Sequence, residues 1–399
     1  MPRPCLHCKS LTHADTACPL YLRSLSIQHA KSLLSKPDFS GVSPAPFIGR
    51  FGYPHVFVGA LATPVQENKE LLDSPKKWVS QDLSIGSIAS LRSGLINARS
   101  VVDVRHVDRI LPVIQEVALA SQPVDVDVSL KKLPSWKFNT DSHHAPMGPS
   151  VELQKLSLLS NPHISTRVQK VVDDTDLLAS GGMQLLHKHG VEEYDLSKML
   201  SVGALGVGAQ RRLVPTRWAI TATDDMLGKQ ILADVRSYPL FSESMVLCSS
   251  YLGNFYVVLL LPGFWQYELF EMISSNAEHF STDYEGFSGR IKYAEQCAGG
   301  YYTVRLAVCE WLQEKKHQSS VLVFRFITPE YDLPLGVWVT REASRKAMSM
   351  KPIKFSSKEL ALLFVSRLVH AKFSISLSKF FKESCMLSGL QQKSLWDFK

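Results

Sequence analysis

The chain has 399 residues, of which 45% are apolar, 20% charged and 10% aromatic, a globular composition that excludes wholesale disorder, collagen and a coiled-coil rod. Its longest apolar run, residues 256–265, is interrupted by Pro262 and is much shorter than the roughly 20 residues of a membrane-spanning helix. The net charge of +7 lies at the two ends of the chain: residues 351–399 hold nine Lys/Arg against three Asp/Glu, and residues 1–40 hold five against two. This distribution indicates termini that contact a polyanion or, alternatively, a solvated basic helix at the C-terminus.

Three of the seven cysteines lie in the first eighteen residues, in the pattern C-x2-C-x4-H-x4-C formed by Cys5, Cys8, His13 and Cys18. The first residues lack a secretory signal, so we expect an intracellular, cytoplasmic and nucleoid-associated protein with reduced thiols. Three sulfurs and one imidazole are a tetrahedral ligand set for structural zinc, with His7 as the alternative to His13. The spacing of this element, residues 1–20, is typical of a zinc knuckle that binds single-stranded nucleic acid, or of a staple for the N-terminus.

The first half of the chain then predicts alternating helices and strands. A polar loop over residues 134–150 contains His143 and His144, which could act as an acid, a base or a metal ligand. On the strand at 124–128, Asp125 and Asp127 share one face and form either a cation site or an ordinary solvated edge. The other expected elements are a helix over 24–36, a Pro/Gly-rich loop over 37–54, a strand over 56–61, helices over 83–96 and 109–120, one or two helices over 165–188 broken at Gly181-Gly182, a strand over 217–222 and a helix over 223–235.

The second half predicts strands over 254–261 and 321–327, helices over 266–275 and 301–316, and three helical stretches over 340–385. The fold class is therefore mixed α/β (α+β), with an N-terminal zinc element, a larger α/β domain, a smaller helix-rich C-terminal domain and a flexible C-terminal tail.

Two regions have the composition of an active site. In the first, arginines could grip phosphates while carboxylates bind Mg²⁺ or Mn²⁺, although a strand-to-helix junction with an acidic first turn has the same composition. The residues concerned are Arg211, Arg212, Arg217, Asp224, Asp225 and Lys229, with Asp173, Asp174 and Asp176 as further carboxylates. In the second, Gly299-Gly300 opens a helix near Arg290 and Arg305, which predicts either an anion site or an ordinary turn.

The last eight residues are rich in apolar side chains after a basic stretch. If residues 395–398 form one 3₁₀ turn, Leu395 and Phe398 lie on one side as a hydrophobic plug and Gln392 is a polar anchor. This resembles the Gln-x-x-aliphatic-x-x-aromatic-aromatic motif that grips the sliding clamp PCNA, with Trp396 at an indifferent position and Lys399 in place of the second aromatic. The alternative is a last helical turn that packs Trp396 and Phe398 on the domain.

Five segments together resemble the archaeal Nre family of DNA repair proteins. They are 49–54 (Gly-Arg-Phe-Gly-Tyr-Pro), 146–149 (Pro-Met-Gly-Pro), 170–177, 212–221 and 299–306. The resemblance implies a role in DNA repair, an N-terminal domain over 21–285, a C-terminal domain over 286–385 and a clamp-binding tail over 386–399. It implies no catalytic mechanism.

The leading hypothesis is therefore a DNA repair factor with a structural zinc element and DNA contact, recruited to PCNA by its C-terminal peptide. One alternative is a metal-dependent nuclease or nucleotide-modifying enzyme that uses the carboxylates named above. Another is a non-catalytic adaptor between the clamp and a second repair protein.

Overall fold

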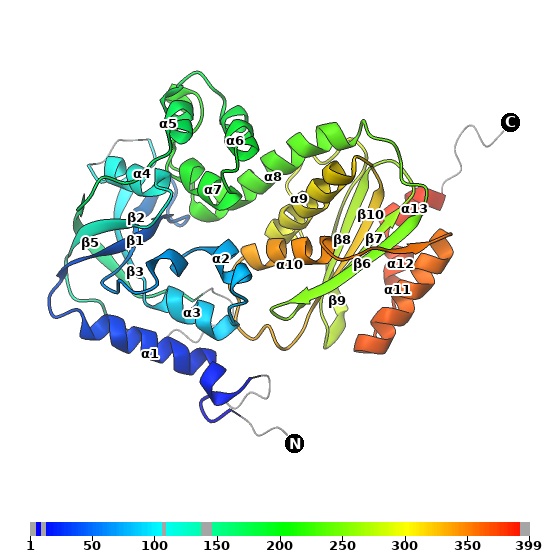
Figure 1. Ribbon diagram of the computed structural model, residues 1–399, viewed down its shortest axis with the longest axis horizontal. Coiled ribbons are helices and arrows are strands. Elements are labelled where there is room, and N and C mark those ends of the chain that lie inside the picture. Colours follow the sequence, from blue (N-terminus) through cyan, green and yellow to red (C-terminus); the bar gives the residue numbers. More distant parts are fainter. Residues whose placement is uncertain (1–4, 9–12, 106–108, 137–145, 392–399) are drawn as a thin grey trace. The chain divides into compact units, whose positions relative to one another are not determined.

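The computed structural model describes residues 5–8, 13–105, 109–136 and 146–391 (Figure 1). The fold is mixed α/β, as predicted. The chain divides into two compact units: unit 1 comprises residues 1–227 with 333–335, and unit 2 comprises 228–332 with 336–399. Among the helices of the described residues, none combines the length and the apolar character that crossing a membrane requires.

Unit 1 is built on a closed five-stranded barrel. Its strands are β1 (Asp38–Ile48), β2 (His55–Thr63), β3 (Ile96–Asp103), β4 (Val124–Leu130) and β5 (Ser150–Leu158). They follow the order β1-β2-β3-β5-β4, and antiparallel pairing of β1 with β4 closes the barrel, while β3 and β5 run parallel. Buried and partly exposed residues alternate along β4, which confirms that its valines face the core and its two aspartates the outside.

Helices surround this barrel, and α1 packs on α3. At that contact the Arg23 guanidinium donates a hydrogen bond to the Ser93 hydroxyl at 3.0 Å, and both side chains are buried. The helical elements of unit 1 are η1 (Asp15–Ala17), α1 (Pro19–Ser32), η2 (Lys69–Leu71), α2 (Pro75–Ser80), α3 (Ile85–Ser93), α4 (Leu111–Leu119), α5 (Thr166–Asp173), α6 (Ala179–Lys188), α7 (Glu193–Ser201), η3 (Gly208–Gln210) and the first part of α8 (Thr216–Val235).

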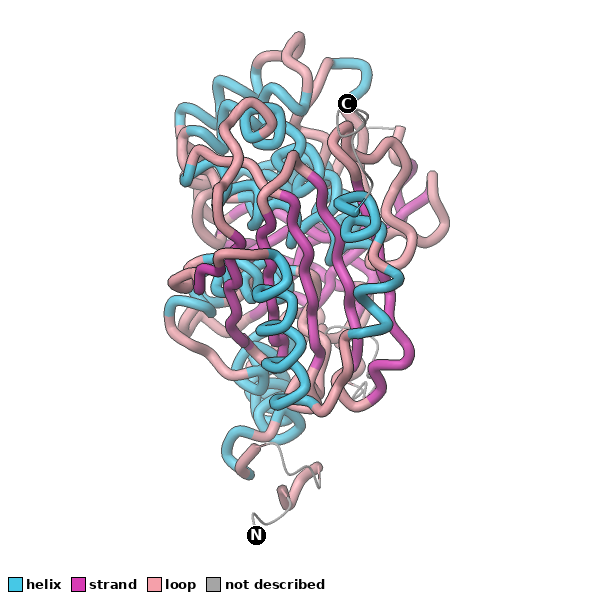
Figure 2. Tube along the Cα trace, turned by 90° about the vertical axis from the view of Figure 1, so that its right-hand side faces the viewer, coloured by secondary structure: helices cyan, strands magenta, loops and turns pink. Residues whose placement is uncertain are grey.

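Unit 2 contains a six-stranded sheet in the order β11-β6-β7-β10-β8-β9, in which only β10 and β8 pair in parallel. Its elements are β6 (Ser244–Tyr251), β7 (Asn254–Leu261), β8 (Gln266–Ile273), β9 (Asn276–Glu285), α9 (Ala298–Lys315), β10 (Ser320–Ile327), α10 (Trp338–Met348), β11 (Ile353–Phe355), α11 (Lys358–Phe373), α12 (Ser378–Glu383) and α13 (Cys385–Gln391). Figure 2 shows the strands side by side with helices lying across one face. Residues of α11, α12 and α13 form an apolar core with that face, so the helical C-terminal region is confirmed.

Two expected elements are wrong because distant contacts override local sequence. Residues 37–54 are largely strand β1 rather than a loop, and a register shift between Val42 and Ala45 accommodates Pro44 in the ladder. Residues 266–275 form strand β8, which ends at Ile273, and a turn rather than a helix. The Glu268 carboxylate of β8 accepts hydrogen bonds from Ser384 and from the backbone of the following residues, which lets a charged residue occupy a buried strand.

The region around α8 also differs from expectation. This helix begins at Thr216, because the carbonyl of Pro215 accepts the N–H groups of the first turn, so the expected strand over 217–222 is absent. The glycine pair expected to break a helix lies inside α6. The break falls just before it, where the Asp174 carboxylate accepts two backbone N–H groups.

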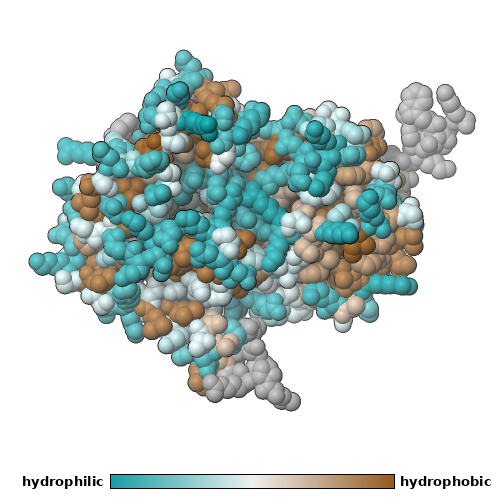
Figure 3. Space-filling model, viewed as in Figure 1, coloured by the Kyte–Doolittle hydropathy of each residue, from teal (hydrophilic) through white to brown (hydrophobic). Residues whose placement is uncertain are grey.

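The surface viewed in Figure 3 is mostly hydrophilic, with hydrophobic residues scattered among polar ones. Single exposed apolar side chains are ordinary in folded proteins, so an exposed apolar residue indicates a binding surface only when the side chains around it support one.

Candidate functional site

Four side chains near the N-terminus gather into one cluster: Cys5, Cys8, His13 and Cys18. One ligand atom from each, three sulfurs and one imidazole nitrogen in all, lies within 4.8 Å of the others. The Cys8 Sγ and His13 Nε2 atoms are 3.1 Å apart. Within the described part of the chain, this is the one group of three or more Cys, His, Asp or Glu side chains placed to share a metal ion.

The turn before α1 positions these ligands. Cys18 is the N-cap residue of α1, which fixes its place at the start of a packed helix. The Asp15 carboxylate accepts the backbone N–H of Leu6 at 2.7 Å and so ties the Cys-x-x-Cys turn to η1. His7 lies elsewhere, with its ring stacked on Tyr21 at a centroid distance of 4.5 Å. His13, and not the alternative His7, therefore completes the cluster.

The surroundings of Cys5 favour its thiolate form, which is the form that ligates metals. Burial acts to raise the pKa of this thiol, but hydrogen bonds from the backbone of Cys8 and His7 and from neighbouring cysteine side chains outweigh it, and the pKa is lowered. Three sulfurs and one imidazole nitrogen form a closed tetrahedral ligand set. The cluster therefore fits a metal such as zinc.

The carboxylates considered for a nuclease do not gather in this way. Asp224 is completely buried in the middle of α8 and Asp225 is beside it, so neither lies in the first turn of a helix. Asp173 accepts a hydrogen bond from the Gln169 amide at 2.8 Å, one turn earlier on α5. Among the described residues, no three carboxylates are placed to share a metal ion.

The three arginines of this region have different roles. Arg211 donates to backbone carbonyls of Val172, Asp174 and Gly206 at 2.7–2.9 Å, so it holds the connection between α5 and α8 together. Arg212 and Arg217 are exposed. Of the three, these last two are therefore the better placed to contact an external phosphate.

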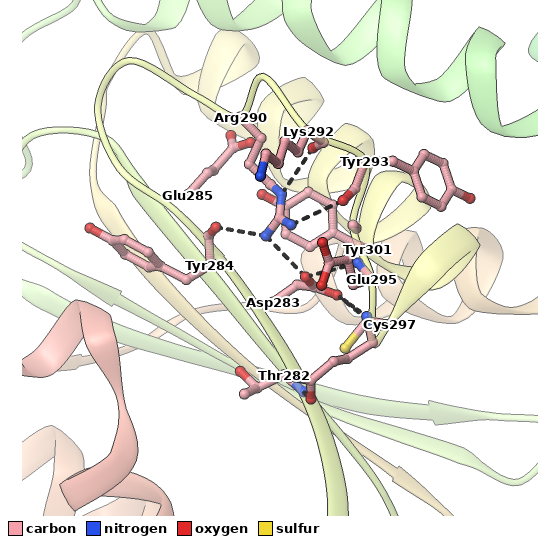
Figure 4. Close-up of polar contacts among 12 residues, drawn as sticks. Thr282, Asp283, Tyr284, Glu285, Arg290, Lys292, Tyr293, Glu295, Cys297 and Tyr301 are labelled. Atoms are coloured by element: carbon pink, nitrogen blue, oxygen red, sulfur yellow. Dashed lines mark hydrogen bonds and ion pairs between the residues drawn. The ribbon is translucent and has the colours of Figure 1, made fainter.

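The expected anion site near the start of α9 is filled by the protein's own carboxylate (Figure 4). Asp283 accepts the backbone N–H groups of Glu295, Gln296 and Cys297 at 3.2, 3.0 and 2.7 Å. The Arg290 guanidinium lies 2.9 Å from the same carboxylate. An internal acid therefore takes the place that a phosphate would need, and the ordinary turn is confirmed.

The other groups of this motif are also used internally. A Cβ on Gly300 would lie 2.6 Å from Oε1 of Glu271, so the glycine provides close packing rather than an open nest. Arg305 pairs with Glu285 at 3.0 Å, and both side chains are almost fully buried. The second active-site candidate is thus a buried ionic network beneath α9.

Several predicted residues have other surroundings or lie outside the described residues. On β4, Asp125 lies 3.9 Å from Lys69 of η2 and Asp127 accepts a hydrogen bond from Ser40 of β1, so both aspartates have partners within unit 1. The predicted residues that lie outside the described ranges are His143, His144, Gln392, Leu395, Trp396, Phe398 and Lys399.

Unit 1 also contains a cavity of about 870 Å³, lined by both polar and apolar groups, that no sequence motif predicted. It lies among η2, α2, the end of α4 and the starts of α5 and α7. Two of its lysines pair with its own carboxylates, Lys76 with Glu192 and Lys198 with Asp195, each at 3.2 Å. Burial acts to lower the pKa of Lys198, but Asp195 and other nearby acids outweigh it and raise that pKa. This internal pairing favours a solvated cavity over a site for a charged ligand.

Comparison with known proteins covers nearly the whole chain. The family model for "Archaeal Nre, N-terminal" matches residues 14–279, and that for "Archaeal Nre, C-terminal" matches residues 285–398. DNA repair protein NreA of Haloferax volcanii is 34% identical over 377 residues, which is 90% of this chain and 88% of that protein. DNA repair protein NreB of Archaeoglobus fulgidus is 34% identical over 403 residues, or 99% of both chains. DNA repair protein NreA of the same organism is 35% identical over 380 residues, or 92% of this chain and 94% of that protein.

No solved structure matches the chain. The two family models follow one another along the sequence, and together with the curated relatives they leave only short segments unmatched. The chain belongs to the archaeal Nre family.

Proposed function

We propose that the chain is a DNA repair factor that contacts DNA and is recruited to the sliding clamp PCNA by its C-terminal peptide. The observation that supports a role in repair is its similarity, over 90% or more of its length, to three proteins named as DNA repair proteins. The N-terminal Cys/His cluster would hold a structural zinc ion that fixes the chain before α1. No group of carboxylates among the described residues favours the Mg²⁺- or Mn²⁺-dependent nuclease.

The clamp contact would use Gln392, Leu395 and Phe398, with Trp396 between the two apolar anchors. A short peptide of this kind binds by inserting a few apolar side chains into a pocket, and those anchors supply most of the binding energy. Tethering to the clamp would raise the local concentration of the protein at DNA without any further contact.

Calorimetric titration of the cognate clamp tests this recruitment. The intact chain should bind, and the double variant Leu395→Ala, Phe398→Ala should lose detectable binding because both anchors are removed. A matched variant at the indifferent positions, Lys393→Ala with Ser394→Ala, should bind nearly as well as the wild type. Equal binding by the anchor variant, or none by the intact chain, would refute recruitment through this peptide.

A further inference from the structure

The barrel of unit 1 has the strand arrangement of a nucleic-acid-binding fold. Its strands close in the order β1-β2-β3-β5-β4, β3 and β5 are parallel, and α4 lies between β3 and β4 in the chain. This is the arrangement of the OB barrel, in which ligands lie across strands 2 and 3 and the loops β1–β2 and β4–β5. A fold alone does not establish a function, so the side chains on that face must supply the evidence.

Strands β2 and β3 present an aromatic and aliphatic outer surface at the corresponding place. Val56 and Val58 are fully buried in the barrel, so Phe57 between them points outward. Phe57 pairs in register with Val101 of β3, and their exposed fractions are 37% and 58%. Two large apolar side chains thus lie next to each other on the outside of a barrel whose inside is already filled.

The β1–β2 loop adds two more exposed rings beside this surface. Phe51 is 73% exposed and Tyr53 is 48% exposed. The Tyr53 ring lies 5.6 Å from that of Trp218, which is itself 47% exposed in the first turn of α8. The loop is an ordered turn, because Gly52 has a φ of +84° and its carbonyl accepts the N–H of His55 at 2.9 Å. The rings are therefore displayed on fixed backbone.

Arginines accompany the rings. The guanidinium of Arg99 lies 4.1 Å from the centre of the Phe57 ring, and that of Arg50 lies 4.7 Å from the centre of the Phe51 ring. Arg217 is exposed in the first turn of α8. Among the described residues, none of these three arginines forms an ion pair with an acid. Their charges are thus available to an anion.

The acidic residues of the same surface are already neutralised. Asp103 at the end of β3 pairs with Arg105 at 2.9 Å, and Glu152 on β5 pairs with Lys131 at 3.0 Å. What remains is positive charge next to exposed aromatic rings. A backbone-tracking positive groove with aromatic stacking platforms is the composition of sites for single-stranded nucleic acid.

We infer that this surface, formed by Arg50, Phe51, Tyr53, Phe57, Arg99, Val101, Arg217 and Trp218 and here called the barrel face, binds single-stranded DNA. Unpaired bases stack on the rings and phosphates contact the arginines. Single strands are favoured over duplex because stacked rings need bases that are not already paired. DNA rather than RNA as the ligand rests on the proposed role in repair.

Fluorescence anisotropy with the full chain and labelled oligothymidylate tests the barrel face. The oligonucleotide should be about 20 nucleotides long, because one such barrel covers roughly 4–16. Phe51→Ala and Tyr53→Ala should each weaken binding roughly 5- to 150-fold, the range that corresponds to losing one stacked base. Phe51 is largely exposed and Tyr53 about half exposed, so these variants should fold like the wild type, which thermal unfolding checks. Arg50→Glu should weaken binding and reduce its dependence on salt.

Two matched controls separate the barrel face from general effects. Phe264→Ala removes a ring that is 63% exposed in unit 2 and should leave the affinity unchanged. Arg167→Glu makes the same charge change as Arg50→Glu on an exposed arginine of α5 and should cost much less. Oligouridylate and a duplex of equal length should both bind more weakly than oligothymidylate.

The inference is overturned if the ring variants bind oligothymidylate like the wild type, if duplex or RNA binds more tightly, or if the intact chain binds none of the three. Failure of the barrel face can be told apart from failure of the proposed repair function. Cells that lack the gene should be sensitive to DNA damage whatever the barrel face binds, and clamp titration does not involve it. Rescue of that sensitivity by the Phe51→Ala variant, together with unchanged DNA affinity, would refute the barrel face but not the repair role.

Discussion

The carboxylate of Asp283 offers a direct test of what holds the start of α9 in place. Its side chain is only 5% exposed, and it accepts three backbone N–H groups besides its ion pair with Arg290. The Asp283→Ala substitution leaves the buried N–H of Cys297 without its acceptor, which costs about 1–3 kcal/mol of folding free energy. The N–H groups of Glu295 and Gln296 are only partly buried, so losing their acceptor costs less. Removing one partner of a buried ion pair costs about 3–5 kcal/mol, and we expect the lower end here because Arg290 is 19% exposed and keeps its hydrogen bonds to the carbonyls of Tyr284 and Tyr293. Because these contributions overlap, we expect unit 2 to lose about 4 kcal/mol.

Urea unfolding and hydrogen exchange of residues 290–300 would measure this loss. Asp283→Asn should lose about half as much, because the amide oxygen keeps some hydrogen bonds while the charge is gone. Asp173→Ala is a matched control, since that exposed carboxylate has one hydrogen-bond partner of its own, and its effect should stay within about 0.5 kcal/mol. A loss below about 1 kcal/mol for Asp283→Ala would mean that water replaces the carboxylate, and the reasoning would be wrong.

Two further predictions concern the N-terminal Cys/His cluster and a buried acid. The purified protein should contain about one zinc ion per chain, which metal analysis measures. The double variant Cys5→Ser, Cys8→Ser should lose this zinc, whereas Cys385→Ser, which replaces an exposed cysteine far along the sequence, should keep it. Burial raises the pKa of Glu268 above 4.5, although hydrogen bonds from Ser384 and the backbone partly offset it. The folded state therefore binds this proton more tightly than the unfolded state, so the contribution of Glu268 to stability is full below pH 4.5 and is lost as pH rises through the raised pKa. Relative to Glu268→Gln, the wild type should be more stable in urea at about pH 4 than at about pH 7, and a reversed order would contradict the assigned direction.

The sequence predicted the elements whose local pattern agrees with their final surroundings. The apolar run of β7 and the helical spacing of apolar residues in α9 predicted the right type of element, and both elements were found close to their expected bounds, although α9 is buried on more than one face. The Cys/His spacing likewise predicted the four side chains that gather in the structure, because a Cys-x-x-Cys turn and a helix cap are local structures.

Elements that depend on distant partners were not predictable in this way. Strand β1 is held by β4, about ninety residues later, and its prolines argue locally for a loop. Strand β8 contains two glutamates whose partners, Arg325 and the segment at Ser384, lie far along the chain. The barrel face was missed for the same reason, since Trp218 meets Tyr53 only after folding. The run Arg50-Phe51-Gly52-Tyr53 was visible in the sequence as a charged aromatic loop.

The edges of the two sheets differ in how they guard against self-association. Among the described residues the barrel is closed by the pairing of β1 with β4, and its shortest junction is the three-residue pairing of β3 with β5, so most of its strand backbone has a partner within the barrel. The sheet of unit 2 is open, and at one side its edge is the three-residue strand β11, where Lys354 pairs with Glu243. A short, charged edge strand is a known protection against edge-to-edge aggregation. Loss of β11 would uncover Ser244, Met245 and Val246 at the start of the eight-residue strand β6, so this small strand covers the first part of that edge.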